Sequence, residues 1–281
     1  MRTIDCSEVR AAVAAELIRT NREIGPDILA ALEQGLRVEE SSAGRAVLGQ
    51  LIENDRLAAR EGLPICQDTG MVIAFVTLGQ EVHFTGGSFR EAVDGAVRDA
   101  YREAGLRNSV VRDPLYGREN TGDNTPAVIH LDLVPGDGLE VDLMVKGFGS
   151  ENMSALTLLS PSEGEAGVRR FVLDAVRRAG PNPCPPIVAG LGLGGTFEQS
   201  ALLSKRALLR PLGRPNPDPR YAALERSLLE DINRLGIGPA GLGGRITALA
   251  VHVETYPTHI ASIPAALNIS CHASRHARVT L

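Results

Sequence analysis

The stretch Pro64-Ile65-Cys66-Gln67-Asp68-Thr69-Gly70 and the apolar run Met71 to Val76 that follows it decide how this chain can fold. Turn formers placed before a β-branched, apolar run predict a loop that leads into a buried strand. The loop carries a thiol, an amide and a carboxylate on consecutive residues, and loops held by rigid elements often carry binding and catalytic groups. For this loop alone, a tight turn with one small buried cysteine is the plainer interpretation.

Two further cysteines lie in segments rich in turn-forming or polar residues. Cys184 lies within Pro181 to Pro186, Cys271 within Asn268 to His276, and Cys6 has no such context. Structural zinc normally takes four ligands in close pairs, and this chain has no such pair. Three thiolates suit a 4Fe–4S cluster that keeps one iron open as a Lewis acid. Three unrelated buried thiols remain the alternative.

The composition is that of an ordinary globular protein of 281 residues, with 43% hydrophobic and 22% charged residues and a net charge of −5. Arginines alternate with acidic residues instead of forming a basic block, so we expect no nucleic acid partner. No apolar run approaches the roughly 20 residues of a membrane span, and the N-terminus lacks a signal peptide's apolar core. We therefore expect a cytoplasmic chain without a membrane segment, in which the cysteines are thiols or ligands.

Hydrophobic periodicity predicts helices and strands in mixed order along the chain. Helices are expected within residues 1–61, with Ser7 as a possible cap, from Ser88 to Tyr101, and over residues 162–179, 197–209 and 220–235. Residues 71–78 with 82–84, and 127–134 with 139–145, are expected to form two hairpins, and residues 187–189, 246–253 and 260–269 further strands. The irregular segment Leu106 to Thr125 is long enough to be functional or disordered.

These elements predict an α+β (mixed α/β) fold, organised as one domain over residues 1–281. A helical N-terminal layer, residues 1–61, should pack on the antiparallel hairpins of a body formed by residues 62–281. The three cysteine loops should converge at one edge of that body, because they can cooperate only if the chain folds as one unit.

The glycine-rich segment Gly190 to Thr196 offers a different function. It follows the apolar residues Ile187 to Ala189 and precedes a predicted helix, and a strand-to-helix turn of this kind can cradle phosphate. Its glycine spacing matches neither the P-loop nor the dinucleotide fingerprint, and the acidic residue expected about 20 residues further on is missing. A nucleotide-binding enzyme is therefore kept as an alternative.

Several motifs together carry a resemblance to a known family. They are Ile65 to Gly70, Asp113-Pro114 with Asn120 to Pro126, Lys146 to Asn152, Gly194 to Thr196, and Ser270 to Ala273. In this order they resemble the class I (iron–sulfur) fumarate hydratases, and more closely the α subunit, or N-terminal domain, of the two-subunit form that includes the L-tartrate dehydratases. Phe148 stands where a third glycine is expected, which bears on substrate identity more than on reaction type.

The resemblance implies a hydro-lyase that reversibly adds water to a small unsaturated dicarboxylate. Fumarate and malate are the first expectation, and tartrate or mesaconate and citramalate are the other possibilities. The family's cofactor is a 4Fe–4S cluster with one open iron, and the residues that match its three ligands are Cys66, Cys184 and Cys271.

The resemblance also assigns the groups that handle the substrate. Asp68 would protonate the leaving hydroxyl, and Gln67, Arg107 and His259 would bind carboxylates, a task that suits a planar guanidinium. Each assignment has a plainer alternative. Asp68 could cap a turn, His259 could be a core histidine, and Arg107 could pair with Asp113 or Asp123.

The resemblance finally implies a partner. The chain ends ten residues after Cys271, whereas single-chain members of the family continue into a second domain that supplies the base. With Asp68 assigned as the acid, Lys146 would need a strongly lowered pKa to serve as that base. We therefore expect a separate β subunit in an α₂β₂ assembly. A non-catalytic partner subunit with buried thiols is the third functional alternative.

Overall fold

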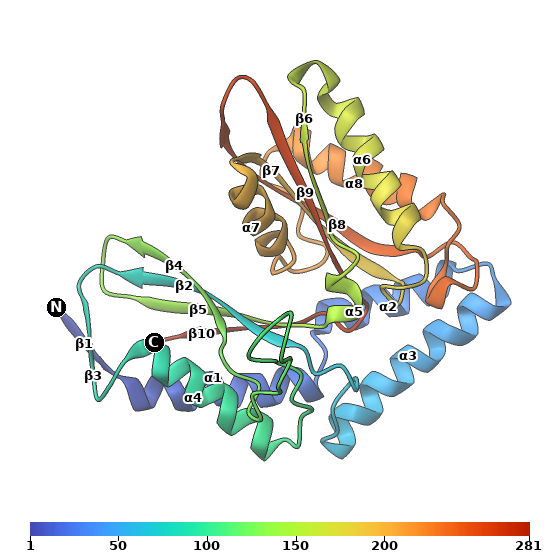
Figure 1. Cartoon of the computed structure of the whole chain (residues 1–281). Helices are drawn as coiled ribbons and strands as arrows, with labels where there is room; N and C mark the ends of the chain where they lie inside the picture. The colour runs from blue at the N-terminus through green and yellow to red at the C-terminus, as the bar shows by residue number, and fades with distance from the viewer. The chain divides into compact units, whose positions relative to one another are not determined.

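The computed structural model describes all residues from Met1 to Leu281 and divides into two compact units (Figure 1). Unit 1 contains Met1–Gly25, Asp55–Gly147 and Arg275–Leu281, and unit 2 contains Pro26–Asn54 and Phe148–Ser274. Because the chain alternates between them, neither unit is one continuous stretch. The expected single domain stays a prediction. No helix is long and apolar enough to cross a membrane.

Unit 1 is built on a four-stranded sheet with the order β10-β5-β2-β4. Its strands are β2 (Met71–Gly79), β4 (Val128–Val134), β5 (Leu139–Lys146) and β10 (Arg275–Thr280), and β1 (Arg2–Asp5) pairs separately with β3 (Val82–Thr85). Helices α1 (Cys6–Arg22) and α4 (Phe89–Glu103) share one apolar core with this sheet. In α1, Val9, Val13 and Leu17 recur every four residues and are fully buried, which is the spacing of a single helix face.

The two predicted hairpins are wrong. Strand β2 lies between β4 and β5 and pairs with both, while β3 pairs with β1 instead of β2. The nearly continuous apolar sequence of β2 agrees with its central place, because consecutive side chains point to opposite faces of the sheet and both faces of β2 are buried. The loop between β4 and β5 passes over the end of β2, where Gly79 N donates to Gly138 O (2.8 Å). The first helix is capped by Asp5, which accepts from Ser7 N, and not by Ser7 itself.

Unit 2 contains a second four-stranded sheet with the order β6-β9-β7-β8. Its strands are β6 (Ala155–Leu159), β7 (Ile187–Gly195), β8 (Ala248–Thr258) and β9 (Ile263–Ser270). Helices α6 (Gly164–Ala179) and α8 (Pro219–Asn233) share its main core, and α7 (Phe197–Ala207) packs on β7. The remaining helices are α2 (Pro26–Val38), α5 (Phe148–Glu151), α3 (Ser42–Glu61), which begins in unit 2 and ends in unit 1, and two short 3₁₀ turns, Pro161–Glu163 and Pro239–Gly241.

The mixed helix and strand content confirms the predicted fold class. The expected N-terminal layer is divided, because α1 belongs to unit 1 and α2 to unit 2. One buried carboxylate ties α2 to the β8 side of unit 2. Glu39, only 3% exposed, accepts from the backbone N–H groups of Arg245 and Ile246 at 2.8–2.9 Å.

The glycine-rich segment is a strand, not a loop. Gly190 and Gly192 lie inside β7, which pairs with β8 on one side and β9 on the other. A Cβ atom at Gly190 would lie 2.1 Å from the carbonyl oxygen of Ser204, and one at Gly192 would lie 2.1 Å from that of Ser200. These glycines therefore allow α7 to approach the strand backbone closely, and the phosphate-loop interpretation loses its basis.

Candidate functional site

The Cys66 loop is held in unit 1 by side chains from three different elements. Three consecutive carbonyl oxygens each accept a hydrogen bond: that of Asp68 from Arg275 Nη2 (2.7 Å), that of Thr69 from Tyr101 Oη (2.5 Å), and that of Gly70 from Asn124 Nδ2 (3.1 Å). At the start of the loop, Ile65 N donates to the carbonyl of Asn21 in α1 (2.8 Å). The loop backbone is thus fixed from α1, α4, β10 and the segment before β4.

Within this loop, Asp68 lies against the cysteine. Its backbone N–H donates to Cys66 Sγ at 3.4 Å, and its Oδ1 accepts from Gly70 N at 3.1 Å. The turn-capping role considered from the sequence is therefore present. A Cβ at Gly147 would lie 3.1 Å from Asp68 Oδ2, so this glycine permits the close approach of the carboxylate.

Gln67 lies within the loop and Arg107 lies beside it, and both side chains are exposed. The Thr69 hydroxyl donates to the Arg107 carbonyl (2.7 Å), which fixes the Arg107 backbone beside the loop. The Arg107 guanidinium makes no ion pair. The two acidic residues that the sequence suggested as its ion-pair partners bind other groups. Asp113 accepts from Leu115 N and Tyr116 N, and Asp123 pairs with Arg98 (3.0 Å). Bonds from the Thr125 hydroxyl and Arg98 lower the pKa of Asp123 to about 2.

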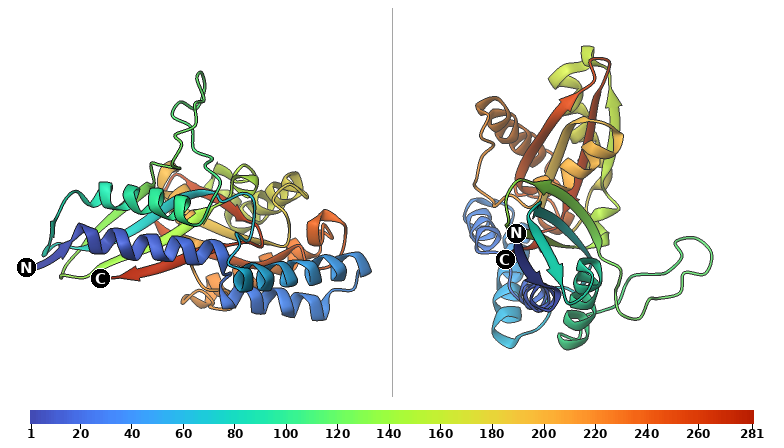
Figure 2. Two further views of the ribbon diagram at one scale, coloured as in Figure 1. Left: turned by 90° about the horizontal axis from the view of Figure 1, so that it is seen from below. Right: turned by 90° about the vertical axis from the view of Figure 1, so that its left-hand side faces the viewer.

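The segment after Arg107 is ordered although it has little regular structure. It projects from unit 1 in both views of Figure 2, where it is drawn in green. A single antiparallel bridge joins Val111 and Asn120. At its base Asn124, fully buried, accepts from Ser109 N at 2.7 Å while donating to Gly70 O. The segment therefore supports the Cys66 loop through its base.

Cys184 and Cys271 lie at the same end of the unit 2 sheet. Strands β7 and β9 are antiparallel with Val188 opposite Ser270, so the residues before β7 and after β9 lie at the same end of the two strands. The Cys184 side chain is exposed and its backbone is in the left-handed region (φ 54°), whereas Cys271 is half-buried. The structure therefore brings two of the three predicted ligands to one end of the unit 2 sheet.

His259 lies at the opposite end of that sheet. It follows Thr258, which is opposite Gly195 at the end of β7, and its Nδ1 accepts from Ala261 N (3.2 Å). At about 3.3 Å per residue, the eight residues of β9 separate the two ends by roughly 26 Å. His259 is exposed, so it is not a core histidine. The structure does not bring it together with Cys184 and Cys271, and its role in binding carboxylates stays a prediction.

The buried histidine of unit 2 is His252, which is 3% exposed in β8. Burial, together with the nearby Arg210 guanidinium, lowers its pKa to about 4. His252 is therefore neutral near neutral pH, and it serves the core.

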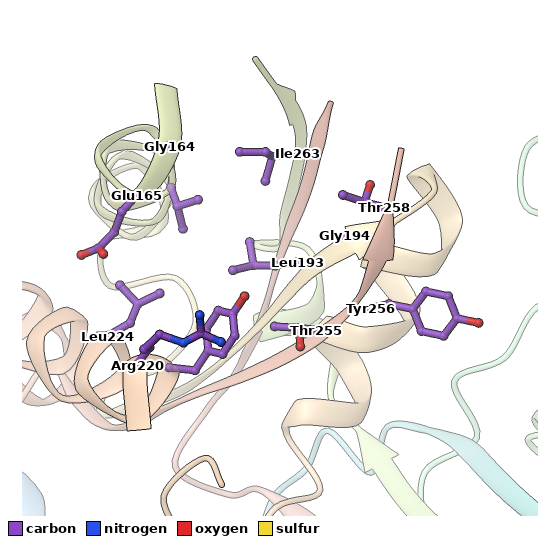
Figure 3. Close-up of a pocket in the computed structure, with 12 residues that line it drawn as sticks. Gly164, Glu165, Leu193, Gly194, Arg220, Leu224, Thr255, Tyr256, Thr258 and Ile263 are labelled. Carbon is purple, nitrogen blue, oxygen red and sulfur yellow. The ribbon is translucent and has the colours of Figure 1, made fainter. Parts of the chain in front are cut away.

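A pocket of about 390 Å³ lies at the His259 end of unit 2 (Figure 3). The first turns of α6 and α8 and the ends of β7 and β8 line it, with Leu193, Leu224 and Ile263 as apolar walls. Its charged groups have partners on their own elements, since Glu165 pairs with Arg169 (2.9 Å) and Arg220 with Asp218 (2.6 Å). The pocket thus offers no unpaired cation for a dicarboxylate, and it is not at the cysteine end of the sheet.

The four thiols differ in their surroundings. Cys6 is buried, its Sγ donates to Gly87 O (3.4 Å), and burial raises its pKa. Cys66 and Cys271 are half-buried and Cys184 is exposed. No group of three or more His, Cys, Asp or Glu side chains in the chain is arranged to hold a metal ion. Because thiolates are the ligands of iron–sulfur clusters, the accessible thiols suit such a cofactor and Cys6 does not. The exposed Cys184 also contradicts the alternative of buried thiols.

Sequence reasoning missed the side chains that hold the loop. Asn124 and Arg275 lie inside or beside the quoted motifs but were given no role. Tyr101 entered the sequence analysis only as the end of a predicted helix. Burial raises the pKa of Tyr101 above its usual value, so its hydroxyl stays protonated and donates to the loop carbonyls. A buried tyrosine needs a hydrogen-bond partner, and that rule was the available signal.

Comparison with known proteins gives the same class of protein as the motifs. The sequence model of the family described as "Fumarate hydratase (Fumerase)" matches residues 10–280. The chain therefore belongs to this family and is a hydro-lyase, which confirms the resemblance read from the sequence.

Individual relatives are similar along most of their length. The chain is 41% identical over 271 residues to the "Putative L(+)-tartrate dehydratase subunit alpha" of Methanocaldococcus jannaschii, covering 94% of this chain and 95% of that protein. It is 36% identical over 252 residues to the "L(+)-tartrate dehydratase subunit alpha" of Escherichia coli strain UTI89, covering 89% and 82%.

Proposed function

We propose that this chain is the α subunit of an iron–sulfur hydro-lyase that reversibly adds water to a small unsaturated dicarboxylate, with fumarate and malate as the first substrate pair. The observation that carries this proposal is the fixed Cys66 loop. It holds the backbone N–H of Asp68 against the Cys66 thiol, and it lies beside Arg107, whose guanidinium makes no ion pair. Family membership supports the reaction type.

In this proposal the ligands of a 4Fe–4S cluster are Cys66, Cys184 and Cys271. When bound, such a cluster supplies an open iron that acts as a Lewis acid on the substrate's hydroxyl. The bond from the Asp68 N–H to Cys66 Sγ (3.4 Å) holds that sulfur against the loop backbone. Cys6, buried and bonded to Gly87, takes no part.

The chain's own residues bind the substrate and move one proton. Arg107 can bind a carboxylate through two parallel N–H bonds, and the exposed amide of Gln67 can bind the same or the second carboxylate. Asp68 holds the proton that the leaving hydroxyl needs, and its backbone cannot drift because Arg275 holds its carbonyl. His259 is kept as a carboxylate-binding residue by the family resemblance alone.

We further propose that turnover requires a separate β subunit, in an α₂β₂ assembly. The two relatives described above are named as α subunits, and this chain lacks an evident base for the carbon-bound proton. Lys146 is buried, and its Nζ donates to Gly147 O (3.1 Å). The predicted cytoplasmic location stays a prediction.

L(+)-tartrate dehydration is the second candidate reaction. It is favoured by the names of the relatives with 35–41% identity. Phe148, 45% exposed at the start of α5, replaces the glycine expected from the resemblance. A larger side chain there would change which dicarboxylates fit, so this position bears on the choice between fumarate and tartrate.

The test is anaerobic purification and reconstitution, followed by iron and sulfide analysis and assays of fumarate, mesaconate and L(+)-tartrate with and without a candidate β chain. We expect brown protein that absorbs at about 400 nm, as thiolate-held clusters do, and turnover only with the β chain. Cys184→Ala should lose the iron, and the matched control Cys6→Ala should keep it. Full iron in Cys184→Ala would overturn the ligand assignment, and turnover by this chain alone would overturn the two-subunit proposal.

A further inference from the structure

Arg275 is a buried cation without an anionic partner. It is 4% exposed at the start of β10 and makes no ion pair. Its Nη1 donates to Asn21 Oδ1 (3.1 Å), its Nη2 donates to the Asp68 carbonyl (2.7 Å), and its Nε has no partner. Both acceptors are neutral groups.

Such an arrangement is poor for stability alone. Burying a guanidinium costs free energy that only close counter-ions and complete hydrogen bonding offset. Arg275 has neither, because its charge faces neutral oxygens and one donor is unsatisfied. An apolar side chain of similar length would pack here without this cost, so the contact that Arg275 makes with Asp68 needs another explanation.

The contacts of Arg275 hold both ends of the segment that contains Cys66 and Asp68. Asn21 is fully buried; its side chain accepts from Arg275, and its carbonyl accepts from Ile65 N at the start of the loop. Arg275 itself binds the Asp68 carbonyl at the other end. Four residues, Ile65 to Asp68, are therefore fixed between one asparagine and one arginine.

The guanidinium also lies near the Asp68 carboxylate without pairing to it. A Cβ at Gly147 would lie 3.1 Å from Asp68 Oδ2 and 3.6 Å from Arg275 Nη2, so both atoms border the same small space. A direct ion pair would hold the carboxylate against the guanidinium. Binding to the main-chain carbonyl instead fixes the position of the residue and leaves the orientation of its carboxylate to other contacts.

We propose that Arg275 is a positioning residue for Asp68, which fixes the loop backbone so that the carboxylate stands where the leaving hydroxyl is protonated. The role of Asp68 is that of the proposed function, and this inference rests on it. Arg275 touches neither substrate nor cluster in this assignment. It acts through the Asp68 carbonyl and through Asn21.

The test compares Arg275→Met and Arg275→Lys with the control Arg278→Met in the reconstituted enzyme with its β chain. Arg278 lies three residues further along β10, is 58% exposed in its side chain, and pairs with Asp142 and Glu140. Because small displacements of a catalytic group can cost about 100-fold in rate, we expect kcat of Arg275→Met to fall roughly 10- to 100-fold. Its KM and its iron content per chain should stay near those of the unchanged protein.

Arg275→Lys keeps one donor and should recover part of kcat, and Arg278→Met should leave kcat unchanged. A second measurement, amide hydrogen exchange, needs no activity. The amides of Ile65 to Gly70 should exchange faster in Arg275→Met than in Arg278→Met. Unchanged kcat and unchanged exchange of the loop amides in Arg275→Met would overturn the proposal. A fall in kcat in Arg278→Met as large as that in Arg275→Met would overturn it too.

Failure of the proposed function gives a different result. In that case the unchanged enzyme turns over no dicarboxylate, while the exchange of the loop amides still reports whether Arg275 holds them. If Arg275→Met does not fold, the kcat and the melting temperature of Arg275→Lys test the proposal instead. A normal kcat together with a lowered melting temperature in Arg275→Lys would show a purely structural residue and overturn the inference.

Discussion

Replacing Gly192 with alanine should force helix α7 away from strand β7. The new Cβ would lie 2.1 Å from the Ser200 carbonyl oxygen and 2.5 Å from Ser204 N, which are both backbone atoms and cannot rotate away. Since carbon–oxygen contacts rarely fall below about 3.3 Å, the helix must retreat by roughly 1 Å. Overpacking of this kind costs typically about 1–3 kcal/mol.

We expect Gly192→Ala to lower the free energy of unfolding by about 3 kcal/mol, the upper end of that range, because the backbone must move and side chains cannot absorb the clash. For a chain of this size that corresponds to a fall in the melting temperature of roughly 6 °C. The control is Gly49→Ala in α3, where a Cβ meets nothing within 4 Å. Alanine there should stabilise the helix by about 1 kcal/mol.

Thermal unfolding followed by circular dichroism measures both variants, with and without ATP or NAD. If the glycines instead formed a phosphate loop, nucleotide would raise the melting temperature of the unchanged protein, and Gly192→Ala would remove that shift with little other effect. A melting temperature for Gly192→Ala equal to that of the unchanged protein would refute the packing argument.

Three further predictions follow from the site and from the contacts of unit 2. Asp68→Asn should keep iron and substrate binding but lose about 10²–10⁴-fold in kcat, because an amide cannot deliver the proton; near-normal turnover would assign the acid elsewhere. Arg107→Lys should raise KM roughly tenfold or more through loss of the paired N–H bonds, with kcat little changed; steady-state kinetics would contradict this if KM stayed constant. Burial acts to raise the pKa of Glu39, but bonds from the N–H groups of Arg245, Ser41, Ile246 and Glu40 outweigh it, so the pKa lies below its usual value. The carboxylate therefore stabilises the fold above the unfolded pKa, near about 4.3, and this contribution is lost as the pH falls through the folded value. Urea unfolding across this range should show a weaker pH dependence for Glu39→Gln than for the unchanged protein, and equal dependence would exclude the carboxylate as its source.

Helices were readable from sequence because their signals are local. Val9, Val13 and Leu17 recur at helical spacing in α1, whose cap, Asp5, lies two residues before the expected Ser7, and α8 begins at Pro219, one residue before the predicted start. Strand pairing was not readable in this way. Residues 127–145 look like a hairpin in isolation, and only the pairing of β2 with a strand on each side, a property of the folded sheet, separates β4 from β5.

The site residues also differ in whether a local sequence signal reveals them. Motif context was enough to nominate the Cys66 loop and Arg107, and the structure joins them through the bond from Thr69 to the Arg107 carbonyl. The function of the glycines in β7 depends on how closely α7 approaches the backbone of that strand, and the spacing of residues in the sequence does not show this distance. Arg275 is more than 200 residues from Asp68 in the sequence, and a contact so distant has no local signal at all.

The interleaving of the units sets an order of events during synthesis. Strand β10, which pairs Arg275 with Val145 of β5, follows the whole segment Phe148–Ser274. At about 5–20 residues per second, a ribosome needs roughly 6 to 25 s to make these roughly 130 residues. Throughout that interval β5 has an open edge, and the Asp68 carbonyl lacks its arginine. We therefore expect the nascent Cys66 loop to be only partly ordered, and iron to enter after β10 has emerged.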